Sequence, residues 1–217
     1  MATLRLDYVI MFGGQTTSQT PGKPAQSDDD TWLFDGSTNA WTEWIVGTSG
    51  MRGAVPPARW CHGMASLGDA KSVVMFGGFT GVSGTPPNKN LQDTWLFDTT
   101  NGWVLHPTKG IVPDARMAHA MATLREGTVV MSGGWTGINS NVEFSDLWRF
   151  TADVGWRQIF PVGAWGGAQS GSGSAGGGGN SDWSLNPNPL RRDAHSMAQL
   201  GPNRVLMAFG YGVPWYL

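Results

Sequence analysis

Apolar and polar positions alternate in short runs along this chain, and the runs recur in a fixed order. The clearest run has an aromatic residue at every second position: Trp32 and Phe34, Trp95 and Phe97, and Trp148 and Phe150. A period of two puts both aromatic side chains on one face of a β-strand. No segment shows a comparable helical period. The pattern therefore predicts an all-β chain whose strands are strongly buried on one side.

Three further runs accompany the aromatic one. An Arg-x-x-His-x-Met-Ala run begins at Arg59, Arg116 and Arg192 and contains His62, His119 and His195. An apolar run follows and ends in a glycine pair at Gly13 and Gly14, Gly77 and Gly78, and Gly133 and Gly134, with a looser copy at Gly210. Each aromatic run begins with an aspartate (Asp30, Asp93, Asp146) and is followed by a single tryptophan (Trp41, Trp103, Trp156). The order is therefore that of a repeat.

A repeat of roughly 50 residues that contains four short strands is typical of a β-propeller blade. On these motifs the chain resembles the kelch-repeat family over nearly all of its length. The resemblance implies a kelch-type β-propeller of about three and a half four-stranded blades. We place the blades at residues 1–46, 59–106 and 116–160, with a partial blade at 192–211, in a single domain spanning 1–217.

The two ends of the chain fall inside the repeat. Met1 to Gly14 aligns without gaps on Met121 to Gly134, with nine of fourteen residues identical. The first Arg-x-x-His is thus absent, and the last copy stops after its second strand. Propellers usually have about 4 to 8 blades. The hypothesis is a fragment that forms an open arc rather than a closed ring, and the alternatives are a complete, unusual protein or a ring completed by a second copy.

The connections between strands sort into two lengths. Labelled A to D from the inside of a blade, the strands have long B to C connections (15–29, 79–92, 135–144) and long D to A connections (46–58, 107–115, 161–191). Both kinds lie on one face of a propeller, and long loops on a rigid scaffold commonly carry recognition. We predict that this face binds a protein partner, with Arg59, Arg116, Arg192, Trp135 and Lys89 as candidate contacts. The Gly/Ser-rich stretch 163–182 is predicted to be a flexible insertion.

The repeated polar residues have a structural and a functional interpretation. The arginines and aspartates begin strands A and C, so we expect ion pairs between them; a ring of arginines that binds an acidic partner is the alternative. The histidines could converge as a metal set. We favour core histidines hydrogen-bonded to the backbone, and predict no metal. The glycine pairs are expected to allow unusual backbone torsions or close contacts between blades.

Composition narrows the function classes further. The chain has 217 residues, a net charge of −2 and 14% charged residues, so no nucleic-acid-binding surface is indicated. Its 12 tryptophans are expected to serve packing. The single cysteine, Cys61, excludes an intrachain disulfide, and no apolar run is long enough to span a membrane. We predict a cytoplasmic location, with a homo-oligomer possible but not indicated.

An enzyme is the second function class. Some kelch-type propellers are copper oxidases that use Tyr, His and a Cys crosslinked to Tyr, but here Cys61 lies within a repeat motif and the three tyrosines lie near the chain ends. The sequence thus predicts no catalytic residue and no cofactor. We expect a non-catalytic interaction scaffold. The alternative is a fragment of a kelch-type enzyme, carbohydrate-active or oxidase-like, with its active site in missing blades.

Overall fold

The structure is a computed structural model of the whole chain. It describes residues 1–5, 7–16, 26–47, 50–69, 71–82, 85–107, 110–137, 142–160, 192–208 and 210. All regular elements in these ranges are β-strands, as the alternation predicted, and they contain no helix. None of these segments therefore includes a helix that could cross a membrane. The stretch predicted to be a flexible insertion, 163–182, lies outside the described residues.

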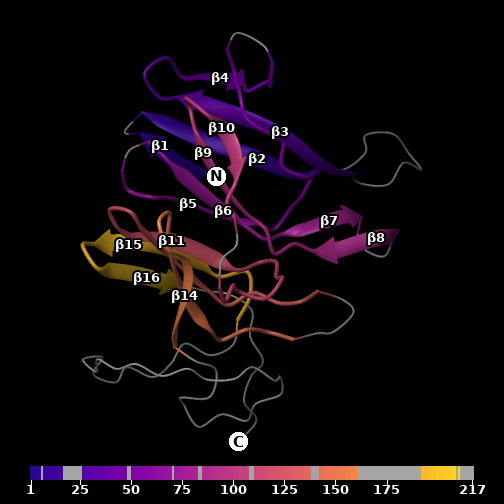
Figure 1. Cartoon of the computed structure of the whole chain (residues 1–217), viewed down its shortest axis with the longest axis vertical. Helices are drawn as coiled ribbons and strands as arrows, with labels where there is room; N and C mark the ends of the chain where they lie inside the picture. Colours follow the sequence, from indigo (N-terminus) through magenta and orange to yellow (C-terminus); the bar gives the residue numbers. More distant parts are fainter. Residues whose placement is uncertain are drawn as a thin grey trace, which may run out of the picture.

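Sixteen strands form in the described part of the chain, and twelve of them make three antiparallel four-stranded sheets (Figure 1). The first sheet is β1 (Ala2–Arg5), β2 (Tyr8–Thr16), β3 (Gln26–Asp35) and β4 (Ala40–Glu43). The second is β5 (Gly63–Ser66), β6 (Val73–Phe76), β9 (Thr94–Asp98) and β10 (Gly102–Leu105). The third is β11 (Ala120–Arg125), β12 (Thr128–Ser132), β13 (Leu147–Thr151) and β14 (Gly155–Phe160).

Two strand pairs complete the description. The pair β15 (Ser196–Gly201) and β16 (Arg204–Ala208) is the described part of a fourth sheet, and β15 contacts β11. The pair β7 (Phe79–Val82) and β8 (Thr85–Asn90) projects from the second sheet, as Figure 1 shows. The inner strands β1, β5, β11 and β15 follow one another as neighbours, and the described residues form no closed ring. The predicted all-β class, built of antiparallel four-stranded sheets, is confirmed.

The register of each sheet repeats because the sequence motifs repeat. Met75 in β6 lies opposite Met64 in β5 and Trp95 in β9, and Met131 in β12 lies opposite Met121 and Trp148 in the same way. Met11 and Trp32 are paired likewise in the first sheet. Opposed side chains on one face of an antiparallel sheet are close enough to pack. One face of each of these sheets therefore has the same large side chains in its central strands.

The apolar core lies between sheets rather than within one. One cluster joins Ile10 and Phe12 of the first sheet to Met75 and Phe97 of the second, and another joins Val74 and Phe76 of the second sheet to Met131 and Phe150 of the third. A four-stranded sheet is one layer thick, so its apolar faces are covered only by its neighbours. Stacking of sheets is therefore the main source of burial.

One expectation about the connections is wrong. The segments 15–29 and 79–92 were expected to be loops, but much of each is strand: β2 and β3 stay paired out to Thr16 and Gln26, and 79–90 contains the β7–β8 hairpin. Residues 135–144 also contain a bridge between Trp135 and Glu143. We call these connecting segments excursions. Backbone groups within an excursion pair with each other, which satisfies hydrogen bonds that an irregular loop would leave to water.

Candidate protein-interaction face

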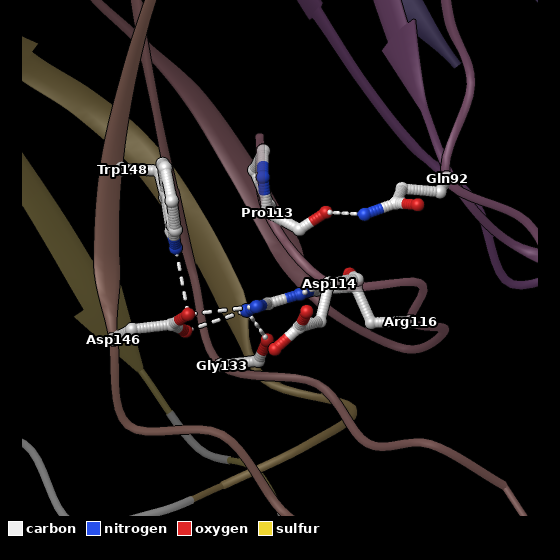
Figure 2. A network of polar contacts seen from close by, with 7 residues as sticks. All are labelled: Gln92, Pro113, Asp114, Arg116, Gly133, Asp146 and Trp148. Carbon is white, nitrogen blue, oxygen red and sulfur yellow. Dashed lines mark hydrogen bonds and ion pairs between the residues drawn. The ribbon is translucent and has the colours of Figure 1, made fainter. Parts of the chain in front are cut away.

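A buried polar cluster lies at the base of the long-connection face of the third sheet (Figure 2). Arg116 donates from Nη1 and Nη2 to the two carboxylate oxygens of Asp146, at 2.5 and 2.7 Å. Asp146 also accepts from Nε1 of Trp148 at 2.6 Å, and Arg116 donates to the carbonyl of Gly133 at 3.0 Å. The guanidinium of Arg116 also lies over the ring of Phe144, 3.8 Å from its centroid. Arg116, which precedes β11, thus connects Asp146 at the start of β13 to Gly133 at the end of β12.

The second sheet repeats this cluster. Arg59 donates to both carboxylate oxygens of Asp93 at 2.6 Å and to the carbonyl of Gly77 at 3.0 Å, and Trp95 donates to Asp93 at 2.7 Å. Burial alone would raise the pKa of the Asp93 carboxyl. The hydrogen bonds and charge of Arg59, together with the hydrogen bond from Trp95, hold this pKa below its ordinary value. The predicted ion pairs between the arginine and aspartate series are confirmed in these two sheets.

The burial of these arginines corrects the predicted partner contacts. Arg59 and Arg116 are each 0% exposed, and their guanidinium groups are occupied by carboxylate and carbonyl oxygens. The structure does not support them as contacts for a partner. Arg192 is half-buried at the start of the fourth sheet, and its carbonyl accepts a hydrogen bond from Gly134. In the first sheet Asp30 accepts from Trp32 Nε1 at 2.6 Å.

Each glycine pair holds the next sheet by its backbone. The second glycine donates to the carbonyl of the following arginine at 2.9 Å in all three copies: Gly14 to Arg59, Gly78 to Arg116, and Gly134 to Arg192. The first glycine of the second pair, Gly77, has a φ of 62°, and a Cβ there would lie 2.7 Å from the Arg116 carbonyl oxygen. Only glycine fits this close approach with a left-handed backbone.

The excursions of neighbouring sheets pack on one another above these clusters. Ser27 Oγ of the first sheet and Trp60 Nε1 both donate to the carbonyl of Gly81 in β7, at 2.9 and 3.1 Å. Asn90, at the end of β8, donates from its side-chain amide to the carbonyl of Trp135 in the third excursion. The three excursions therefore form one continuous surface, which we call the hairpin face. It consists of residues 14–16 and 26–28, Trp60, β7–β8, and 135–137 with 142–144.

The two remaining candidate contacts lie on this hairpin face. Lys89 is exposed on β8 and pairs with Thr80 across the hairpin. Trp135 is half-buried, and its backbone exchanges hydrogen bonds with Met117 at 3.0 Å. Trp60, which the sequence analysis did not select, is also half-buried there and packs edge to face on Phe79. A positive charge and two partly exposed indoles are thus held on a paired backbone.

The histidines of the repeat lie in the interior. His119 and His195 are each 6% exposed, and Phe76 packs edge to face against the His119 ring. Burial, with the nearby charge of Arg116, holds the pKa of His119 well below its ordinary value, and burial lowers that of His195 to about 4. The ring nitrogens of His195 have no hydrogen-bond partner within the described ranges. For His119 an interaction with the Phe76 backbone partly opposes the lowering of its pKa, although the contact is outside ordinary hydrogen-bond geometry.

No metal or cofactor site emerges from the part of the chain that the structure describes. No three His, Cys, Asp or Glu side chains there come close enough together to bind an ion. A cavity of about 550 Å³ lies along the inner strands β1, β5, β11 and β15, and its described lining, which includes Met64, Met121 and Met197, contains no charged residue. The single cysteine, Cys61, is exposed and is a free thiol.

Sequence analysis missed the polar contact that connects neighbouring sheets. Trp103 of the second sheet donates from Nε1 to Oγ1 of Thr31 in the first at 3.0 Å, and Trp156 donates to Thr94 at 2.9 Å. The threonine directly precedes the first tryptophan in Asp-Thr-Trp-Leu-Phe-Asp. The available signal was that this threonine recurs in copies that also have the later single tryptophan. Buried indole N–H groups usually have such a partner.

Repeated four-stranded antiparallel sheets, joined by glycine pairs and interlocked by tryptophans, define a chain of β-propeller blades. The model of the KLHDC2/KLHL20/DRC7 Kelch-repeats domain matches residues 1–173. The chain belongs to the kelch-repeat family. It is 25% identical over 165 residues to an F-box/kelch-repeat protein of Arabidopsis thaliana, a match that covers 71% of this chain and 31% of the relative. The chain thus matches about a third of that relative's length.

Proposed function

We propose that the chain is a non-catalytic scaffold that binds a protein partner through the hairpin face. The observation that carries this proposal is the asymmetry between the two ends of the sheets. At one end the strands are joined by short turns such as 126–127 and 36–39, whereas at the other they extend into the paired excursions of the hairpin face. Elaboration of one end of a rigid scaffold is where binding surfaces usually lie. Kelch repeats are commonly protein-interaction modules, which supports the same conclusion.

The chemistry of the hairpin face fits a protein partner. Exposed Lys89 supplies charge, and half-buried Trp60 and Trp135 supply aromatic area on backbones that are already ordered. Tryptophan is enriched among residues that dominate interface energies, and ordered backbones lower the entropic cost of association. Buried Arg59 and Arg116 act beneath this surface, because they fix the glycine turns from which the second and third excursions begin.

A site-specific crosslinking experiment tests the proposal. A photoreactive amino acid is placed at Lys89 on the hairpin face or, as a matched control, at exposed Arg125 beside a short turn. We expect a crosslinked partner from the first position, at least 10-fold more abundant than from the second. The same partner should bind at least 10-fold more weakly to a Lys89→Ala/Trp60→Ala variant. Equal crosslinking at both positions, or crosslinking only at Arg125, would contradict the proposal.

A further inference from the structure

The turns that join the third and fourth strands of the first and second sheets share one design. In each turn, a backbone N–H donates to the side chain of the aspartate that ends the third strand, at 2.8 Å for Asp35 and 2.7 Å for Asp98. Each turn also has an exposed asparagine, Asn39 or Asn101, directly before the fourth strand. Aspartates commonly bond the backbone of tight turns in this way. The two asparagines therefore form a matched pair.

The residues that follow the two asparagines differ. Asn39 precedes Ala40, whereas Asn101 precedes Gly102, and the sequence contains no second Asn-Gly pair. Because glycine has no side chain, its backbone can approach a neighbouring group more closely than that of alanine. The backbone nitrogen of Gly102 is thus less shielded from the preceding side-chain amide than that of Ala40.

The packing of Gly102 requires a glycine at this position. Gly102 has a φ of 67°, and a Cβ there would overlap the carbonyl oxygen of Arg52 and lie 3.3 Å from Cα of Gly53. In the same contact, a Cβ on Gly53 would lie 2.8 Å from the carbonyl oxygen of Asn101. A larger residue at position 102 would therefore displace the segment that connects the first two sheets. The contact retains the Asn-Gly pair.

We infer that Asn101 is a site of spontaneous deamidation, a covalent modification that replaces its side-chain amide by a carboxylate. The backbone nitrogen of Gly102 attacks Cγ of Asn101, its proton passes through water to the side-chain amide, and this amide leaves as ammonia. Water then opens the cyclic imide at either of its carbonyl carbons, which gives aspartate or isoaspartate at this position. Water is the co-reactant, and nothing is oxidised or reduced. Asn101 is exposed, so water reaches it.

Deamidation replaces a hydrogen bond of this turn by a repulsion. Nδ2 of Asn101 donates to Oδ2 of Asp98 at 2.9 Å. After the reaction a carboxylate stands in place of the donor, so two negative charges face each other across the turn. The modified turn therefore loses one of the contacts that fix its conformation.

The modified turn borders the contact that joins the first two sheets. Directly after the turn, β10 contains Trp103, which is 1% exposed and donates from Nε1 to Oγ1 of Thr31 in the first sheet. The carbonyl of Trp103 also accepts from the backbone of Ala54 at 2.8 Å. Isoaspartate adds a methylene to the backbone next to this strand, and closely packed segments do not absorb such an insertion without moving. Deamidation therefore loosens the junction between the first and second sheets.

The first experiment incubates the folded chain at mildly alkaline pH and measures deamidation by peptide mass spectrometry. Asn39 is the matched control in the same digest, and we expect Asn101 to react at least 10-fold faster. Asp35 precedes Gly36, but isomerisation of an aspartate leaves the mass unchanged and is not counted. Asn101→Gln should abolish the reaction, because the longer side chain would have to close a larger ring. Equal rates at Asn101 and Asn39, or reaction only in the urea-unfolded chain, would overturn the inference.

The second experiment measures the effect on the junction. Anion exchange separates the deamidated chain by its extra negative charge, and hydrogen exchange then compares it with the unmodified chain. We expect the amides of β10 to exchange at least 10-fold faster after deamidation, and those of β12 in the third sheet to change less than 2-fold. The Asn101→Gln variant, incubated in the same way, should show neither change. Unaltered exchange of β10 in the deamidated chain would refute the loosening of the junction.

Discussion

The junction between the second and third sheets and the junction between the third and fourth have the same backbone contacts. Gly78 donates to the Arg116 carbonyl and Gly134 to the Arg192 carbonyl, each at 2.9 Å. Ala118 donates to Cys61 at 2.9 Å, and Ala194 donates to Ala118 at 2.8 Å. These contacts need only the right torsions and tolerate several side chains. The backbone therefore determines where each sheet lies relative to the previous one.

The side chains at the two junctions differ in several ways. Phe76 packs on both His119 and Trp156 at the first junction. At the second junction the equivalent residue, which also precedes the glycine pair, is Ser132. Leu147 replaces the acceptor Thr94. Val74 in β6 and Val130 in β12, which occupy the same position at the two junctions, are 0% and 3% exposed. The aromatic contact of Phe76 and the hydroxyl acceptor Thr94, unlike the backbone pairing, therefore have no equivalent among the residues at the second junction.

The largest expected effect is the loss of the tryptophan that joins the second and third sheets. Trp156 is 5% exposed and contacts Phe76 and Phe150. We expect Trp156→Ala to lower the free energy of unfolding by about 3 to 5 kcal/mol, because a buried aromatic is lost and a cavity remains. Trp41 is the matched control, since it is 46% exposed. Urea unfolding should give less than about 1.5 kcal/mol for Trp41→Ala; similar losses would refute the comparison.

Acid should destabilise the chain through its buried histidines. Burial lowers the pKa of His62 to about 3, so the folded state binds fewer protons than the unfolded state between this value and about 6.5. The contribution of neutral, buried His62 to the free energy of unfolding is thus complete above pH 6.5 and falls as the pH is lowered. His62 alone is expected to lose about 2 kcal/mol at pH 5. We expect a smaller loss between pH 7 and pH 5 in His119→Met than in the unaltered chain. An identical loss would show that His119 does not contribute.

The threonine acceptor gives a smaller effect at the same junction. Thr94 is 0% exposed and receives the hydrogen bond of Trp156 Nε1. Thr94→Val keeps the shape but leaves a buried N–H without a partner, which costs about 1 to 3 kcal/mol. A double-mutant cycle with Trp156→Phe isolates this hydrogen bond. A coupling energy near zero would mean that the indole finds another acceptor.

The smallest effect concerns Arg149 and Arg157, which lie opposite each other on β13 and β14. Arg149→Leu removes the like-charge pair with Arg157 and restores the residue type of Leu33 and Leu96. We expect a gain of about 0.2 to 1 kcal/mol in the free energy of unfolding at low salt, declining as salt is added. Thermal melts at two salt concentrations measure it. A loss of stability would show that Arg149 has a stabilising partner that outweighs the repulsion from Arg157.

The repeat could be predicted from the sequence because its period and its paired aromatics are local signals. The fold class followed from the repeat and its resemblance to kelch repeats, and the arginine–aspartate pairing followed from the positions of these residues at strand starts. The packing role of Trp103 and Trp156 followed from the abundance of tryptophan. Other features depended on contacts between sheets. Burial of Arg59 and Arg116 could not be read from one strand, because the carbonyls that cover them come from a different part of the chain.

The sequence indicated which segments form the long connections, but it did not indicate that part of 79–92 is a β-hairpin. Gly and Pro residues in 79–92 indicate a loop, and yet tertiary context pairs 79–82 with 85–90. The left-handed backbone at Cys61, Ala118 and Ala194 was also unpredictable, because alanine rarely adopts a positive φ. These torsions are set by the hydrogen bonds between inner strands. Local propensity thus failed where contacts between sheets determine the backbone.

Native-state hydrogen exchange tests most directly the claim that side chains decide how firmly each sheet is held. The comparison is between the amides of the inner strands β11 and β15, which pair with β12 and β16 in the same register. We predict that β15–β16 opens with a free energy at least about 2 kcal/mol lower, so that its amides exchange about 30-fold faster. Equal protection of the two strand pairs would contradict the account, because it would mean that backbone contacts alone hold the fourth sheet.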